Sequence, residues 1–130
     1  MKTKEIDGYA TLLHNARMQG CSTEQLSNGL DVFTRKDAYS IQESGIVLRQ
    51  EQGEFIIGLK MGLTSEAKRK QMNLDSPLYG VLTDRMQIEN GGCFSLEGSI
   101  HPKIEPEVAF LISKDLKGKG SLDDVVNAID

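Results

Sequence analysis

The sequence predicts a mixed α+β protein, in which an α-rich N-terminal region precedes the first part of a β-rich domain. In residues 1–54, apolar side chains recur at three- and four-residue spacing, which is typical of helices that bury one face. From Phe55 onward, apolar residues occupy successive positions, which is typical of a strand buried on both faces. We therefore place a helical region at residues 1–54 and the start of a β-rich domain at residues 55–130.

Three helices are predicted in the first region. The first covers residues 4–18 and is followed by a glycine that can end it. The second is short and opens at a capping box that begins at Ser22, with a glutamine three residues later. The third is capped by Thr34 and closed by Gly53. Together these signals make the first third of the chain α-rich.

Strands and short helices are predicted in the second region. Residues 55–63 form the first strand, and Thr64 or Ser65 caps the helix that follows it. The remaining predicted elements are a short strand at residues 79–82, a strand at residues 104–113 that is apolar on both faces, and a last helix capped by Ser121.

The composition is that of an ordinary globular protein. Of 130 residues, 38% are hydrophobic and 26% are charged, which argues against a largely disordered chain. The net charge is −4 and no basic cluster occurs, so binding to nucleic acid or to an anionic membrane surface is not expected. No apolar run approaches the roughly 18 residues of a membrane span.

The two cysteines and the N-terminal residues indicate in which cellular compartment the protein is expected. Cys21 and Cys93 follow no ligand spacing, and we expect two free thiols in a reducing cytoplasm. The first residues are charged but lack the apolar core of a secretory signal.

The end of the sequence suggests a longer protein. The last predicted helix starts at Ser121 and reaches Asp130 without a stop signal, whereas a natural terminus usually ends in polar, frayed residues. We therefore expect the chain to be the N-terminal piece of something longer.

Glu105 and Glu107 are the first candidates for chemistry. Residues two apart share a face of a strand, so both carboxylates would lie together at the rim of the core. Two such carboxylates need protonation, cations or a metal, and oxygen ligands favour a hard ion such as Mg²⁺ or Mn²⁺. The alternative is an edge strand, marked by Pro106, with both glutamates in water.

Lys60 is the second candidate, because it lies inside an apolar run. A buried lysine is costly unless it has an acidic partner or a task, such as facing an anionic substrate or donating a proton. The alternative is a strand-end lysine whose ammonium group reaches water. Gly62 beside it would let a ligand approach the backbone closely.

Three ordered segments resemble one enzyme family. They are Gly-Leu-Lys-Met-Gly-Leu-Thr-Ser at residues 58–65, Pro-Leu-Tyr-Gly-Val-Leu-Thr-Asp at residues 77–84, and His-Pro-Lys-Ile-Glu-Pro-Glu-Val-Ala-Phe at residues 101–110. In these segments, and in Asp-Leu-Lys-Gly at residues 115–118, the chain resembles the 2-oxopent-4-enoate hydratase and 4-oxalocrotonate decarboxylase family. The likeness runs from about residue 37 to the end of the chain.

The resemblance implies a fold and a metal site. It implies a fumarylacetoacetate hydrolase-type catalytic domain that acts on 2-oxo acids from aromatic meta-cleavage with Mg²⁺ or Mn²⁺. By position, Glu105 and Glu107 correspond to two metal ligands and Lys60 to the active-site lysine, while Leu63 and Leu78 would contact substrate. Family chains are roughly twice as long, so the third acidic ligand would lie outside this sequence.

The resemblance also indicates which of the family's two activities to expect. Hydratases of the family commonly carry aspartate in a Pro-Asp-Tyr/Phe-Gly element, and Leu78 occupies that position here. We therefore expect a decarboxylase that converts 4-oxalocrotonate to 2-hydroxypenta-2,4-dienoate, with the hydratase activity as the alternative. A further alternative is an inactive fragment or assembly module. The expected partners are the 2-oxo acid, further copies of the chain in a homo-oligomer, and a sister hydratase or decarboxylase.

Overall fold

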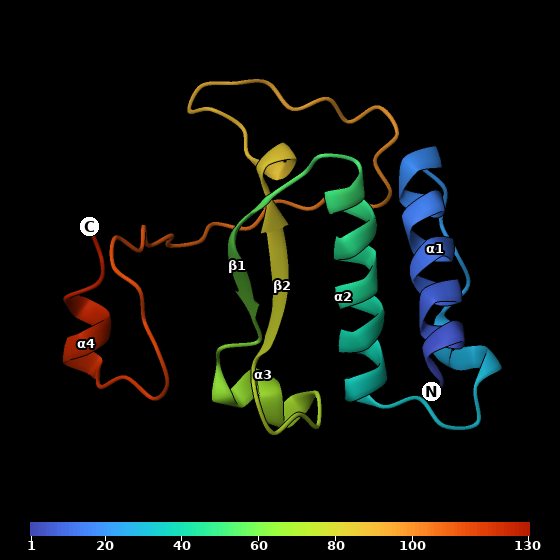
Figure 1. Cartoon of the computed structure of the whole chain (residues 1–130), viewed down its shortest axis with the longest axis horizontal. Helices are drawn as coiled ribbons and strands as arrows, with labels where there is room; N and C mark the ends of the chain where they lie inside the picture. The colour runs from blue at the N-terminus through green and yellow to red at the C-terminus, as the bar shows by residue number, and fades with distance from the viewer. The chain divides into compact units, whose positions relative to one another are not determined.

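The computed structural model describes all residues, 1–130, and divides into two compact units (Figure 1). Residues 1–100 form the first unit and residues 101–130 the second. The first unit contains α1 (Thr3–Gln19), η1 (Leu26–Gly29), α2 (Arg35–Glu51), β1 (Ile56–Gly62), α3 (Glu66–Gln71), β2 (Leu78–Thr83) and η2 (Asp84–Met86). The second contains α4 (Leu122–Val126). A mixed α+β class is therefore confirmed, and the boundary predicted between residues 54 and 55 falls inside the first unit, between α2 and β1.

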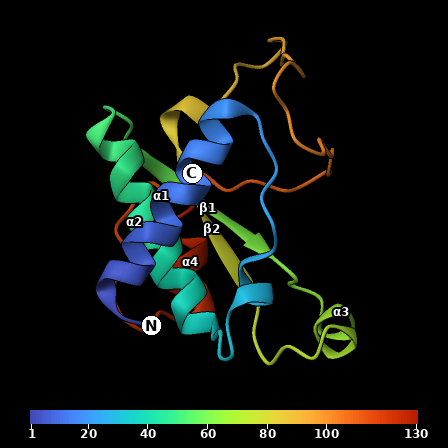
Figure 2. The same cartoon turned by 90° about the vertical axis from the view of Figure 1, so that its right-hand side faces the viewer.

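The two long helices lie side by side, as Figure 2 shows, and bury small or aliphatic side chains such as Ala10 and Ile41. The predicted cap of α2 is confirmed. The backbone N–H of Asp37 donates to Thr34 Oγ1 at 3.2 Å, and the Asp37 carboxylate accepts from the Thr34 backbone N–H at 3.0 Å. The amino group of Met1 also donates to that carboxylate, at 2.7 Å.

The short second helix does not start where the sequence predicts. The capping box at Ser22 is wrong, because η1 is a single 3₁₀ turn that begins at Leu26 with Gln25 as its N-cap residue. A helix of one turn forms few hydrogen bonds to offset the entropy lost in fixing its first turn. A capping signal in the sequence is therefore a weak guide to where so short a helix begins.

Strands β1 and β2 pair as an antiparallel hairpin, with α3 in the connection between them. Ser65 is the N-cap residue of α3, which confirms one of the two predicted caps. The predicted burial of β1 on both faces is wrong. Leu59 is 60% exposed and Met61 is 48% exposed, because a two-stranded sheet lacks the further layers that would cover them.

The strand predicted at residues 104–113 does not form. That segment makes only an isolated bridge, between Ile112 and Ile129, and Ile104 is 97% exposed. A strand needs a run of backbone hydrogen bonds to a neighbour, and the single bridge, in which the Asp130 N–H also donates to the Leu111 carbonyl oxygen at 3.0 Å, is too short to make one. The start of the last helix is confirmed, since Ser121 and Asp124 form its capping box. Its predicted continuation to the end of the sequence is wrong, because α4 ends at Val126 and Ile129 instead bridges to Ile112.

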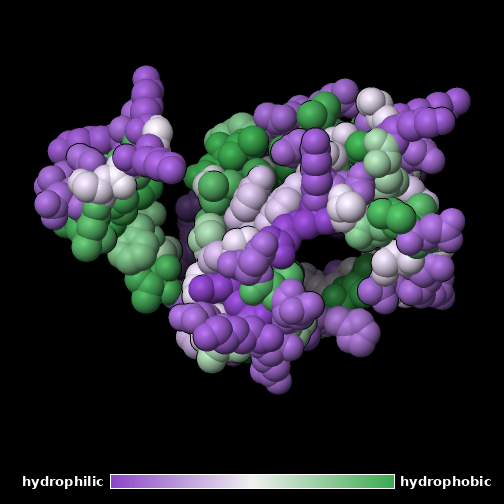
Figure 3. Space-filling model, turned by 90° about the horizontal axis from the view of Figure 1, so that it is seen from below, coloured by the Kyte–Doolittle hydropathy of each residue, from purple (hydrophilic) through white to green (hydrophobic).

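Much apolar surface is open to solvent. The fully buried hydrophobic residues are Ala10, Ile41 and Ala128, and Figure 3 shows green hydrophobic areas among the purple hydrophilic ones. No helix is both long and apolar enough to cross a membrane.

The lowered pKa of Asp37 leads us to expect that the N-terminal cap of α2 is sensitive to acid. Hydrogen bonds from the Met1 amino group and from Thr34 lower its pKa from 3.8 to about 2. A depressed carboxyl pKa stabilises the fold above about pH 4, and this contribution is lost as the pH falls from about 4 to about 2. We expect the difference in unfolding midpoint between the wild-type chain and Asp37→Asn to be large at pH 7 and nearly absent at pH 2. A difference independent of pH, measured by circular dichroism, would contradict this.

Candidate functional site

The hairpin brings three of the predicted site residues together. In its register, Lys60 pairs with Gly80 and Gly62 pairs with Leu78. Leu63 directly follows Gly62, so the predicted lysine and the two predicted leucines gather at one end of the hairpin. Lys60 is exposed, whereas Leu63 and Leu78 are half-buried.

The turn at Leu63 is held in an unusual backbone conformation. Its φ is 54°, in the left-handed region that branched aliphatic residues rarely adopt, at a cost of order 1 kcal/mol or more. Arg69 of α3 donates from Nη1 to the carbonyl oxygen of Leu63 at 3.1 Å and also to that of Thr64. The guanidinium therefore fixes the chain where it leaves β1.

A tyrosine pair fixes the other strand. The rings of Tyr39 and Tyr79 stack with centroids 4.5 Å apart and an interplanar angle of 13°. The backbone N–H of Tyr79 donates to the Tyr39 hydroxyl oxygen at 3.2 Å. These two contacts hold β2 against helix α2 at Tyr79, the residue next to Leu78.

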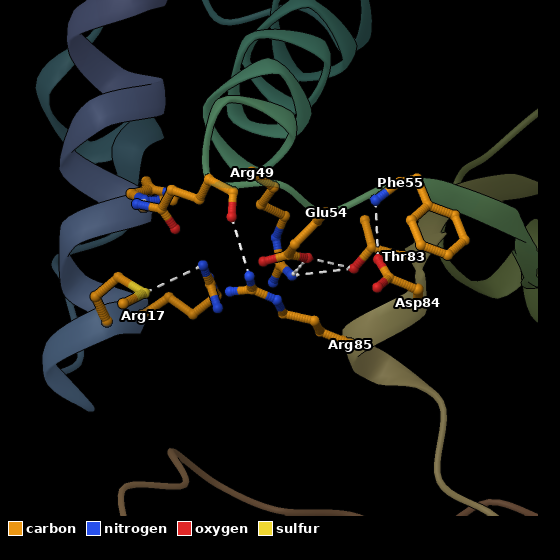
Figure 4. Close-up of polar contacts among 10 residues, drawn as sticks. Arg17, Arg49, Glu54, Phe55, Thr83, Asp84 and Arg85 are labelled. Atoms are coloured by element: carbon orange, nitrogen blue, oxygen red, sulfur yellow. Dashed lines mark hydrogen bonds and ion pairs between the residues drawn. The ribbon is translucent and has the colours of Figure 1, made fainter.

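A buried ionic cluster joins the far end of α2 to the hairpin (Figure 4). Arg49 donates from Nη1 to Glu54 Oε2 at 2.9 Å, and the Thr83 hydroxyl donates to the same oxygen at 2.5 Å. The side chains of Arg49 and Glu54 are 13% and 3% exposed. The Thr83 hydrogen bond, followed by the bond and charge of Arg49, lowers the pKa of Glu54 although burial opposes the shift.

Further groups complete this cluster. Phe55 donates its backbone N–H to Asp84 Oδ1 at 2.8 Å, and Arg85 donates from Nη2 to the carbonyl oxygen of Gln52 at 3.0 Å. Figure 4 shows the guanidinium groups of Arg17, Arg49 and Arg85 gathered around Glu54. This cluster was not predicted, and its only local signal in the sequence is a glutamate directly before the apolar run at Phe55.

Glu54→Gln is expected to destabilise the chain by about 2–3 kcal/mol, because it leaves the poorly exposed guanidinium of Arg49 without its charged partner. Asp75→Asn is the matched control, since it breaks an ion pair with Arg35 in which the aspartate is 85% exposed. Urea unfolding of both variants checks the prediction. Similar small losses in the two would contradict it.

A cavity of ≈ 380 Å³ lies in the first unit between α1 and α2. Its lining is mostly apolar, with Leu13, Phe33 and Ile41 among its walls and Arg17 and Arg49 among its polar groups. None of the predicted site residues lines it.

Glu105 and Glu107 belong to the second unit, and both are exposed. They lie two residues apart in a segment that is neither helix nor strand. Their carboxylate oxygens are the ligand type that Mg²⁺ and Ca²⁺ take. The structure brings no third aspartate, glutamate, histidine or cysteine into a metal-binding group with them. The two glutamates therefore fit a divalent ion in chemistry but would supply only part of its ligands.

The chain is similar to enzymes of known activity, although no family model matches it. It is 37% identical over 131 aligned positions to 4-oxalocrotonate decarboxylase of Pseudomonas putida, which covers 100% of this chain and 50% of that protein. It is also 38% identical over 124 positions to 2-keto-4-pentenoate hydratase of Burkholderia vietnamiensis, with 95% of this chain and 47% of that protein covered. The predicted resemblance to decarboxylases and hydratases is thus confirmed.

Solved structures agree. The structure of 4-oxalocrotonate decarboxylase from Pseudomonas putida G7 with magnesium and adipate superposes with a TM-score of 0.93 at 35% identity, covering 100% of this chain and 50% of that one. A second structure of that enzyme holds calcium and acetate. The predicted link to a divalent metal is therefore supported by similar proteins. The chain spans about half the length of the relatives it matches.

Proposed function

We propose that this chain forms about half of a divalent-metal-dependent lyase that decarboxylates 4-oxalocrotonate to 2-hydroxypenta-2,4-dienoate. The observation that carries this proposal is the match, over the whole chain, to a 4-oxalocrotonate decarboxylase in both sequence and structure. In the complete protein, residues 1–54 would form a helical region and residues 55–130 would begin a catalytic domain of fumarylacetoacetate hydrolase type. The apolar surface left open here would be covered by the other half.

The residues have distinct parts in this proposal. Glu105 and Glu107 would hold the metal together with ligands from outside this chain. When bound, the metal supplies a Lewis acid for the 2-oxo acid end of the substrate. Lys60 would place its ammonium group where negative charge develops, and Leu63 and Leu78 would supply an apolar wall.

The reaction balances within the substrate. The bond between C5 and C6 breaks, C6 leaves as CO₂, and its bonding electrons pass through the conjugated chain to the 2-oxo oxygen. That oxygen then takes one proton, which yields 2-hydroxypenta-2,4-dienoate. Lys60 can stabilise the charge on the oxygen or deliver this proton.

Hydration of 2-hydroxypenta-2,4-dienoate is the second candidate, because hydratases match the chain almost as well. Leu78 favours decarboxylation. It pairs with Gly62 next to the Lys60 position, and it is an apolar side chain where a hydratase would need a group to direct water.

The test uses a completed protein, defined here as a chimera in which this chain replaces the matching half of the Pseudomonas putida enzyme. We expect CO₂ release from 2-oxohex-3-enedioate with Mg²⁺. Conversion of 2-hydroxypenta-2,4-dienoate to a 4-hydroxy-2-oxo acid without CO₂ release would reverse the ranking. A folded chimera that does neither would favour an assembly module. We propose that the completed protein is a homo-oligomer. Light scattering on the same sample measures its oligomeric state and, after addition of a sister enzyme, their association.

A further inference from the structure

The cavity between α1 and α2 is large enough for a small molecule. Its volume of ≈ 380 Å³ lies within the range of roughly 300–1,000 Å³ that ligand sites occupy. Its apolar walls come from both helices, from the segment before α2 and from β2, and include Leu13, Phe33, Ile41 and Val81. Gly45 of α2 also lines it, and a Cβ atom there would meet nothing within 4 Å. The side chains of this unit therefore leave the space between the helices open.

Guanidinium groups gather at one end of this cavity. Arg17 and Arg49 line it from the last turns of α1 and α2, and Figure 4 shows Arg85 beside them. Two carboxylates belong to the same cluster. Glu54 accepts from Arg49, and Asp84 accepts a backbone N–H. Three cations against two carboxylates leave one positive charge in excess.

Arg17 has no strong acceptor for its N–H groups. Its Nη2 donates to the sulfur of Met18 at 3.3 Å, and a thioether is a weak acceptor for a guanidinium that has five N–H donors. Partial burial lowers the pKa of Arg17, and the charges of Arg49 and Arg85 lower it further, whereas the charge of Glu54 opposes the shift. An anion beside Arg17 would relieve this repulsion and would match the planar donors of a guanidinium.

We propose that the cavity between α1 and α2 binds an amphipathic monocarboxylate, a small organic acid with one carboxylate and an apolar tail. The carboxylate meets Arg17 and Arg85, and the tail lies among the apolar walls. A single negative charge matches the single excess positive charge, and a second carboxylate on the tail would be buried without a partner. None of the predicted site residues lines this cavity, so the proposal goes beyond the proposed function.

The test uses octanoate, titrated by calorimetry into the completed protein without divalent ions or substrate. We expect about one octanoate per chain. Acetate lacks the tail and octan-1-ol lacks the charge, so each should bind about tenfold more weakly or worse. Gly45→Leu fills the cavity and Arg17→Met removes a charged donor. Each should weaken octanoate binding by about tenfold or more without lowering the unfolding midpoint.

Three further variants serve as controls. Gly8→Leu makes the same substitution on α1, at a glycine outside the cavity whose Cβ would also meet nothing within 4 Å. Lys4→Met removes an exposed cation of α1 that does not line the cavity. Lys60→Met removes the cation of the predicted site. All three should bind octanoate as the wild-type protein does.

Several results would overturn this site. They are a wild-type protein that binds no octanoate, octan-1-ol that binds as tightly as octanoate, and undiminished affinity in Gly45→Leu. Loss of octanoate binding in Lys60→Met also overturns it, because the acid then occupies the predicted site. If Arg17→Met fails to fold, Gly45→Leu and the comparison with octan-1-ol still decide. Octanoate binding by a protein that releases no CO₂ supports the site while the proposed reaction fails.

Discussion

Replacing Lys60 with methionine is expected to lower kcat for CO₂ release by about 10²–10⁴-fold in the completed protein, the range typical of a lost acid–base or charge-stabilising group. Methionine keeps most of the stem length and removes the ammonium group. Because Lys60 is exposed on the hairpin, folding should be unaffected. The measurement is kcat and KM at saturating Mg²⁺, with the unfolding midpoint recorded alongside.

Two companion variants sharpen this result. Lys68→Met removes an exposed lysine from the neighbouring helix α3 and should leave kcat unchanged. Lys60→Arg keeps the charge but not an easily lost proton. If Lys60 acts by charge alone, the arginine variant retains far more activity than the methionine variant. If it delivers a proton, both lose similar activity. A methionine variant within threefold of the wild type would remove Lys60 from the site.

The elements that could be predicted from sequence are those with local causes. The capping boxes at Thr34 and Ser121 depend on residues three apart, and both form in the structure. The hairpin strands at Ile56–Gly62 and Leu78–Thr83 match the apolar runs that predicted them. Such signals act within a few residues and do not depend on what covers the element.

Burial could not be predicted in this way. The apolar pattern of residues 104–113 fits a strand in a sheet, yet a strand forms only where a neighbour supplies a run of hydrogen bonds, and this segment has only an isolated bridge between Ile112 and Ile129. The exposed faces of β1 have the same cause. An amphipathic or apolar pattern shows which side chains of a segment can be buried. Whether they are buried depends on other parts of the chain that must pack against the segment.

The residues of the candidate site likewise fall into those that local motifs predict and those that only the folded structure brings together. Lys60, Leu63 and Leu78 were named from their motifs, and the register then brought them to one end of the hairpin. The cluster of Arg49, Glu54 and Thr83 joins residues up to 34 positions apart, so no short motif could reveal it. The roles of Glu105 and Glu107 stay predictions. One similar enzyme, solved with magnesium and with calcium, supports a divalent metal without assigning its ligands.

Replacing Glu107 with glutamine is expected to weaken Mg²⁺ or Mn²⁺ binding by the completed protein at least about 100-fold, since changes to the groups that merely support metal ligands already cost 10–100-fold. The amide keeps the size of the side chain and removes its charge, so damage to packing should be small. Calorimetric titration with each ion is the measurement, and Glu97→Gln is the control because Glu97 is an exposed carboxylate outside the motif segments at residues 58–65, 77–84 and 101–110. The chain by itself should bind either ion weakly, because no third ligating side chain joins the two glutamates. Equal affinities in wild type and Glu107→Gln would show that these carboxylates are merely solvated, and the metal would then have to be held by residues outside this pair.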